Sequence, residues 1–129
     1  MKKLILFIVL IFTTLNVYAN WIKVVTDEEI DIYVKTDSIK RKDYMVTFWE
    51  MYDFKSTQTA DGKPYNSIKM KSEINCSSEE NRTIFYAPYS ENMGLGKPLE
   101  HVEIPGKKFS IIVPDTINHT VSKFICSKK

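Results

Sequence analysis

Residues 44–54, YMVTFWEMYDF, form the stretch of sequence that decides the fold. Aromatic and β-branched residues dominate it, and such residues favour the pleated surface of a β-strand. Because successive side chains of a strand point to opposite faces, the stretch divides into two sets. One face would hold Tyr44, Val46, Phe48, Tyr52 and Phe54, and the other Met45, Thr47, Trp49, Met51 and Asp53. Both sets are largely apolar, so we predict a central strand that is covered on both faces.

The segments on either side of this strand predict further strands joined by polar turns. Expected strands lie at 21–26, 32–35, 65–76, 82–89, 99–104 and 109–113. Turns rich in Gly, Pro, Asp or Ser separate them, including a polar loop at 56–64 whose turn is Asp61-Gly62. In 65–76 apolar and polar side chains alternate, and this alternation directs Cys76 toward the protein interior.

The last part of the sequence predicts one helix. Pro114-Asp115-Thr116 is typical of a helix start. The apolar residues that follow recur at the spacing of an amphipathic helix, and they are Ile117, Val121, Phe124 and Ile125. We expect the helix to end near Ile125, because Cys126 would otherwise point away from the apolar stripe.

The first residues predict an export signal. Two lysines precede an uncharged apolar run at 4–15, and Val17-Tyr18-Ala19 is typical of a signal-peptidase site. The run is shorter than the roughly 20 residues of a membrane span, although an uncleaved anchor is the alternative. We predict a signal peptide at 1–19 and one exported domain at 20–129, without a membrane span after cleavage. The periplasm, the medium and the cell surface all remain open as its location.

Cys76 and Cys126 are the two cysteines of the sequence. In an oxidising compartment such a pair predicts a disulfide, and free thiols or a metal pair are the alternative. The chain has 18 basic and 16 acidic residues, and loss of Lys2 and Lys3 with the signal peptide would make the two numbers equal. A near-neutral domain argues against nucleic acid as a partner, because phosphate binding needs a positive field.

The sequence contains no pattern that indicates catalysis or a cofactor. His101 and His119 lack a second ligand at metal spacing, and no serine lies in a G-x-S-x-G turn. Gly94-Leu95-Gly96-Lys97 lacks the spacing of a phosphate-binding loop, and the acidic turn at 27–31 lacks that of a calcium loop. We therefore expect a protein that is not an enzyme, with no catalytic residue, metal ligand or cofactor.

Lys40-Arg41-Lys42 is the densest basic run of the exported part. The simpler interpretation is a solvated turn, because three charges are ordinary on a surface. The functional interpretation is a contact for an acidic or sulfated partner, such as a heparin-like sugar. These three residues are our candidate binding residues.

Short motifs with a characteristic order run through the exported chain. They are Trp21, Tyr33, Asp37-Ser38-Ile39-Lys40-Arg41, Trp49, Met51, Asp53, Phe54, Tyr65, Ser67, Lys69, Glu73, Cys76, Asn92-Met93-Gly94-Leu95-Gly96, Ile112-Val113-Pro114 and Cys126. In this order they resemble the bacterial surface-adhesin protein E family. The resemblance implies an α+β fold, with a single antiparallel sheet of about six strands and a C-terminal helix pinned by the disulfide.

The resemblance also implies a non-enzymatic module that binds host extracellular-matrix or serum proteins. Two features depart from the family pattern: the signal peptide has no cysteine for lipid attachment, and Phe109 stands where tryptophan is expected. The first departure keeps a second interpretation open, a soluble periplasmic interaction or inhibitor protein with a bacterial partner. A second copy of the chain, giving a homodimer, is a further partner that the sequence leaves open.

Overall fold

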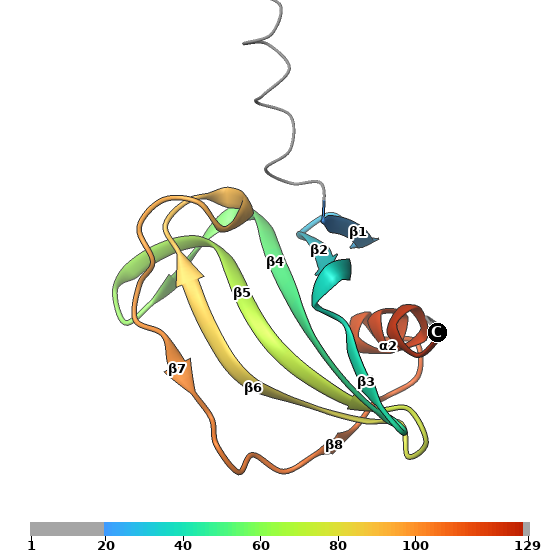
Figure 1. Cartoon of the computed structure of the whole chain (residues 1–129). Coiled ribbons are helices and arrows are strands. Elements are labelled where there is room, and N and C mark those ends of the chain that lie inside the picture. Colours follow the sequence, from blue (N-terminus) through green and yellow to red (C-terminus); the bar gives the residue numbers. More distant parts are fainter. Residues whose placement is uncertain (1–19, 128–129) are drawn as a thin grey trace, which may run out of the picture.

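A computed structural model describes residues 20–127 of the chain as one curved antiparallel sheet with a helix on one face (Figure 1). The strands are β1 (Trp21–Thr26), β2 (Ile30–Lys35), β3 (Lys40–Lys42), β4 (Met45–Ala60), β5 (Lys63–Asn75), β6 (Glu80–Tyr89), β7 (Val102–Glu103) and β8 (Ser110–Ile111), and the helix is α2 (Ile117–Ser127). The predicted signal peptide at 1–19 lies outside the described residues and stays a prediction.

The predicted sheet with a C-terminal helix is confirmed, with eight strands in place of about six. Six of them lie side by side in the order β1-β2-β4-β5-β6-β7. The two additional strands are short: β3 pairs with β4, and β8 pairs with β6. Residues 45–54 of this stretch lie in β4, next to β2 and β5, so the predicted central position is confirmed, whereas Tyr44 precedes the strand and is 66% exposed. The expected cover on both faces is wrong: the core packs on one face, and Trp49 on the other face is only partly buried.

The long β4–β5 hairpin corrects the prediction of a loop at 56–64. β4 continues to Ala60 and β5 begins at Lys63, so the turn consists of Asp61 and Gly62 alone. Both turn residues have positive φ, at 49° and 74°, which suits the tight turns that join antiparallel strands. The side chains between Lys55 and Ala60 are polar and mostly exposed, so this part of the hairpin adds little to the core.

The hydrophobic core lies between α2 and one face of the sheet. Its buried members are Ile30, Ile32, Val34, Val46, Phe48, Ile74, Ile112, Val121 and Ile125. Tyr52 and Phe54 pack against this cluster, so the predicted division of the central strand into two faces is correct for them. Burial of these apolar side chains is the main force that holds the helix on the sheet.

The disulfide between Cys76 and Cys126 is present and joins the end of β5 to the last turn of α2 (S–S 2.12 Å, Cα–Cα 5.7 Å). Cys126 lies inside the helix, which runs to Ser127, so the expected end near Ile125 is wrong. No reversal of the chain is needed, because Cys76 approaches the helix from the sheet. At the other end the Thr116 hydroxyl accepts a hydrogen bond from the His119 backbone N–H at 3.3 Å and caps the helix.

Candidate functional site

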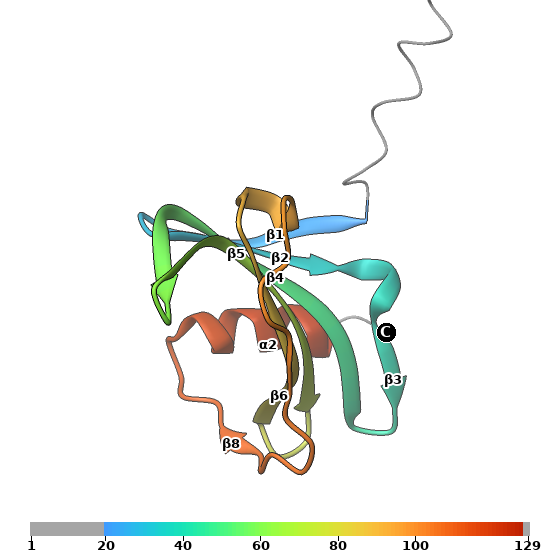
Figure 2. The ribbon, with the colours of Figure 1, turned by 90° about the vertical axis from the view of Figure 1, so that its left-hand side faces the viewer.

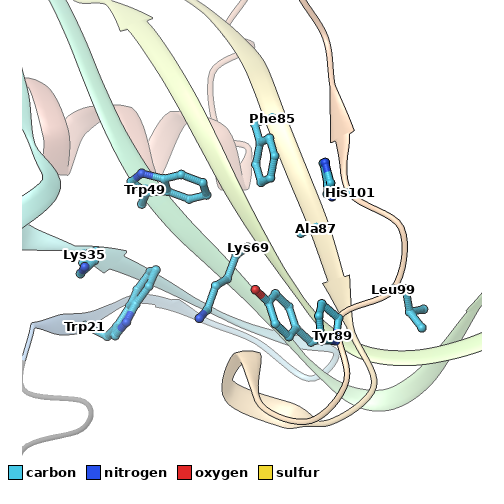
Figure 3. A pocket seen from close by; sticks show the side chains of 10 residues that line it. Trp21, Lys35, Trp49, Lys69, Phe85, Ala87, Tyr89, Leu99 and His101 are labelled. Carbon is cyan, nitrogen blue, oxygen red and sulfur yellow. The ribbon is translucent and has the colours of Figure 1, made fainter.

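The sheet face opposite α2, here called the open face, carries a hollow of about 490 Å³ (Figure 3). We call this hollow the aromatic groove. It is lined by Trp21, Lys35, Trp49, Lys69, Phe85, Ala87, Tyr89, Pro98, Leu99 and His101. Its volume lies in the range of typical ligand sites, and its lining is mostly apolar, as such sites usually are.

The rings of the groove form a row across the sheet. Trp49 comes from β4, Phe85 from β6 and His101 from the segment before β7. Trp49 and Phe85 meet edge to face with 5.4 Å between ring centroids, and His101 stacks on Phe85 at 5.7 Å. Aromatic pairs of this geometry add attraction beyond burial alone, so the row is held in place before any ligand arrives.

A bulge in β6 adds one more apolar side chain to the open face. Lys71 pairs with Phe85, but the next residue of β5, Ser72, pairs with Thr83, so Ile84 is left without a partner in the ladder. Such an extra residue turns its strand locally and redirects a side chain. Ile84 and Phe85 consequently both line hollows on the open face, although they are adjacent in sequence.

Lys69 lies at the centre of the groove, between Trp21 and Tyr89 (Figure 3). Its ammonium nitrogen is 5.0 Å from the centroid of the Tyr89 ring, which is a cation–π contact. Burial lowers the pKa of Lys69, and the positive charge of Lys35 lowers it further. Within residues 20–127 no carboxylate forms an ion pair with Lys69.

The loop after β6 forms one wall of the groove. The carboxylate of Asp53 accepts hydrogen bonds from the Asn92 side chain at 2.9 Å and from the Met93 backbone N–H at 2.8 Å. The Gly94 N–H donates to the buried hydroxyl of Ser67 at 2.9 Å. These bonds fix the loop over β4 and β5, where Gly94 lies next to the sulfur of the fully buried Met51. The loop joins two strands, as the sequence predicted for the glycine-rich segment.

Two further hollows continue the groove along the open face. One is lined by Lys35, Asp37, Ser38, Lys40, Thr47, Trp49, Lys71, Glu73 and Ile84. The other is lined by Trp49, Lys71, Ile84, Phe85, Glu103 and Pro105. Because all three share Trp49, they form a continuous surface longer than one small molecule.

The candidate binding residues Lys40, Arg41 and Lys42 form β3 instead of a turn, and all three are exposed. Alternation along the strand separates them. Lys40 lines a hollow on the open face, whereas the Arg41 guanidinium donates to the Ile125 carbonyl in α2 at 3.0 Å. Figure 2 shows β3 beside the end of α2. A role of these residues in binding therefore stays a prediction, with Arg41 also serving the fold.

The other polar groups singled out in the sequence have structural partners. His119 accepts a hydrogen bond from the Asp115 N–H at 3.1 Å, next to the start of α2. In the acidic turn, Asp27 accepts from the N–H groups of Glu29 and Ile30, and Asp31 pairs with Lys23 at 3.4 Å. Among the described residues, no group of three or more His, Cys, Asp or Glu side chains is placed to hold a metal ion.

A family model, described as surface-adhesin protein E, matches residues 21–127. The chain belongs to the surface-adhesin protein E family. No curated protein sequence gives a significant match. In this protein E family member, Phe109 takes the place of the expected tryptophan, and the Arg82 guanidinium lies 4.3 Å from the centroid of its ring.

Solved structures of protein E from Haemophilus influenzae share the fold. The selenomethionine form has a TM-score of 0.64 at 19% identity, over 88% of this chain and 90% of that chain. Crystal form II has a TM-score of 0.65 at 18% identity, over 86% of this chain and 90% of that chain. A structure from the non-typeable bacterium has a TM-score of 0.60 at 18% identity, over 87% of this chain and 78% of that chain.

Family and fold together support a surface-adhesin-like binding module with protein partners. Membership of this family implies an exported or cell-surface protein, and adhesins generally act by binding and not by catalysis. Within the described part of the chain, no helix is long and apolar enough to span a membrane.

The aromatic groove was not predicted from the sequence. Alternation did place Trp49 on one face of β4 and Lys69 on one face of β5. What was missing was the pairing of these faces across the sheet, together with the bulge at Ile84 and the position of Trp21. The mixture of lysines and aromatic rings on one face of the strands would have been a usable signal. A solvent-exposed strand face is usually polar and a buried one apolar, so a face that carries both kinds of side chain indicates a binding surface.

Proposed function

We propose that this protein E family member is an exported, non-enzymatic module that binds host extracellular-matrix or serum proteins. The observation that carries the proposal is the aromatic groove, an accessible row of rings on a sheet face that α2 does not cover. Tryptophan, tyrosine and phenylalanine are enriched where proteins bind one another, and they supply much of the binding energy there. The family match over residues 21–127 supports the same conclusion.

We also propose that Lys40 and Lys42 contribute to the encounter with an acidic or sulfated host partner. Both are exposed on β3, at the side of the open face where Lys40 lines a hollow. Exposed charges act over a screening length of about 8 Å at physiological salt, so they mainly accelerate association. Binding should therefore weaken at high ionic strength, and more so than in a variant without these two lysines.

The experiment that tests host-protein binding has two parts. The purified exported protein is immobilised, exposed to serum and to solubilised extracellular matrix, and each retained protein is identified and titrated for saturable binding. In parallel, intact cells are labelled with a membrane-impermeant reagent. Labelling together with a saturable host partner supports the proposal. Release by osmotic shock, with a saturable partner only in periplasmic extract, supports the periplasmic interaction or inhibitor protein instead.

A further inference from the structure

Lys69 is a positive charge without a negative partner in an apolar setting. Its stem packs against Gly94, so its ammonium group is directed toward the rings of the groove. Lys35, the other cation of the groove lining, repels it, and the ten lining residues include no carboxylate. A half-buried cation of this kind is stabilised when an anion comes close, because the low local dielectric strengthens their attraction. The groove is therefore complementary to a ligand that brings a carboxylate.

The rest of the lining is complementary to an apolar group. Trp21 and Tyr89 lie on either side of Lys69, and Trp49 and Phe85 follow next to them (Figure 3). An apolar side chain between such rings gains both burial and ring contacts. A ligand that fits must therefore present an acidic group and an apolar group on the same side, a few ångströms apart.

We propose that the aromatic groove binds an extended segment of a partner protein in which an acidic and an aromatic residue occupy alternate positions. Alternate side chains of an extended segment share one face, so the carboxylate reaches Lys69 while the ring lies against Trp49 and Phe85. The inference rests on the proposed function and names the chemistry of the partner at that same site. An extended segment also fits the length of the open face, because the hollows next to the groove continue past Lys71.

A sulfated sugar is the other occupant that lysines would attract. It fits the groove less well, because repeated sulfates need many cations and few apolar walls, whereas this lining has two lysines among rings and aliphatic side chains. The test below therefore includes a sulfated oligosaccharide as a competing probe.

Tryptophan reports directly on the groove, because the chain has two tryptophans and both line it. The probe is a capped heptapeptide, acetyl-Ser-Asp-Ser-Phe-Ser-Asp-Ser-amide, which is titrated into the exported protein while the two indole N–H signals are followed by NMR. We expect saturable shifts of both signals. The peptide with Asn in place of Asp and the peptide with Ser in place of Phe should each bind roughly fivefold more weakly.

The matched variants are Lys69→Gln and Lys123→Gln. Both remove one positive charge, but Lys123 is exposed on α2, on the opposite side of the sheet. Lys69→Gln should weaken the acidic peptide roughly fivefold and leave the Asn peptide unchanged, whereas Lys123→Gln should change neither. Lys69→Gln keeps most of the stem, and a thermal unfolding curve shows whether the variant is folded. Lys35→Gln, which removes the other cation of the groove lining, is a second variant for the case that Lys69→Gln is not folded, and it should also weaken the acidic peptide and leave the Asn peptide unchanged.

Three results would overturn the inference: no saturable shift with the acidic peptide, equal affinity for the Asp and Asn peptides, or tighter saturation of the indole signals by a heparin-derived octasaccharide. Host-protein binding is measured on the same variants. If the exported protein binds a host protein that Lys69→Gln leaves unaffected, the groove inference fails and the proposed function stands. If the peptide binds as expected but no host protein does, the proposed function fails and the groove retains its ligand chemistry.

Discussion

Glu50 is an acidic side chain of β4, on the same strand face as Phe48. It is 6% exposed, and the hydroxyl of Ser72 donates a hydrogen bond to its Oε1 at 3.1 Å. Burial raises the pKa of Glu50 from 4.5 to about 7, and the hydrogen bond from Ser72 offsets only part of that effect. Burial, together with the nearby Glu50 carboxylate, also raises the pKa of Tyr52.

This raised pKa makes the stability of the protein depend on pH. Between about pH 4.5 and 7 the folded protein keeps the Glu50 proton that the unfolded chain has already lost. The contribution of Glu50 to the free energy of unfolding should therefore be highest below pH 4.5. It should fall by roughly 3 kcal/mol in total as the pH rises to about 7. Urea unfolding at a series of pH values measures the slope.

Glu50→Gln should abolish most of this slope, because glutamine keeps the shape and the acceptor for Ser72 but does not ionise. The matched control is Glu28→Gln, which removes an exposed acid of the turn before β2. At pH 8 the Glu50→Gln protein should be more stable than the unmodified one, and at pH 5 the difference should shrink. An unchanged slope in Glu50→Gln would assign the pH dependence to another group.

The loop that forms one wall of the aromatic groove needs a glycine at position 94 for two reasons. Its φ of 67° lies in the left-handed region, and a Cβ at this position would meet the side chain of Lys69. Gly94→Ala should lower the free energy of unfolding by about 2 kcal/mol and displace Lys69 from its place beside Tyr89. Chemical unfolding and the indole N–H shifts of the two tryptophans measure these effects.

Gly62→Ala is the control for backbone strain alone. Gly62 has a φ of 74°, but a Cβ there would meet no atom within 4 Å. Gly62→Ala should lower the free energy of unfolding by about 1 kcal/mol without changing the indole N–H signals of the tryptophans. Equal changes of these signals in both variants would show that Gly94 does not position Lys69.

At the scale of elements, β3 fastens the end of α2. The Arg41 guanidinium donates to the Ile125 carbonyl at 3.0 Å, and a cation at a helix C-terminus is favourable. Arg41→Ser should therefore destabilise the protein by about 1–2 kcal/mol, whereas Lys40→Ser and Lys42→Ser should stay within about 0.5 kcal/mol. Urea unfolding compares the three variants. If all three are equally stable, the contact with α2 contributes nothing measurable.

Residue preferences and the helix-start signal predicted several elements, and they failed where pairing between strands decides the structure. β1 and the central strand were predictable because their residues favour strands, and the start of α2 was predictable from Thr116. The arm of the β4–β5 hairpin at 56–60 was not, because its side chains are mostly exposed and polar, and its pairing with β5 resumes only at Gln58 after an irregularity in the register. At β3 the sequence predicted a turn, because three adjacent, exposed basic residues show no alternation.

At the scale of the whole molecule, the sequence determined the core face better than the candidate site. Core residues can be recognised by their hydrophobicity, and the sequence of a single strand is enough to show which of its faces is apolar. The aromatic groove instead joins side chains from β1, β2, β4, β5 and β6 with the segment before β7. Its shape depends on the register between strands and on the bulge at Ile84, and neither has a signature within one strand. The cysteine pair was predictable because export and an even count suffice.

The disulfide carries the last prediction, because it links the two layers of the molecule. Cys76 and Cys126 are 50 residues apart, and closing a loop of that length restricts the unfolded chain by about 4 kcal/mol on the chain-entropy model. Reduction should lower the free energy of unfolding by up to this amount, since α2 would then be held only by noncovalent contacts, among them the packing of Val121 and Ile125 and the hydrogen bond from Arg41. Urea unfolding with and without reductant measures the loss, and thiol titration of the unreduced, unfolded protein should find no free thiol. Equal stability in both conditions would mean that the noncovalent contacts of α2 are sufficient to fix it on the sheet.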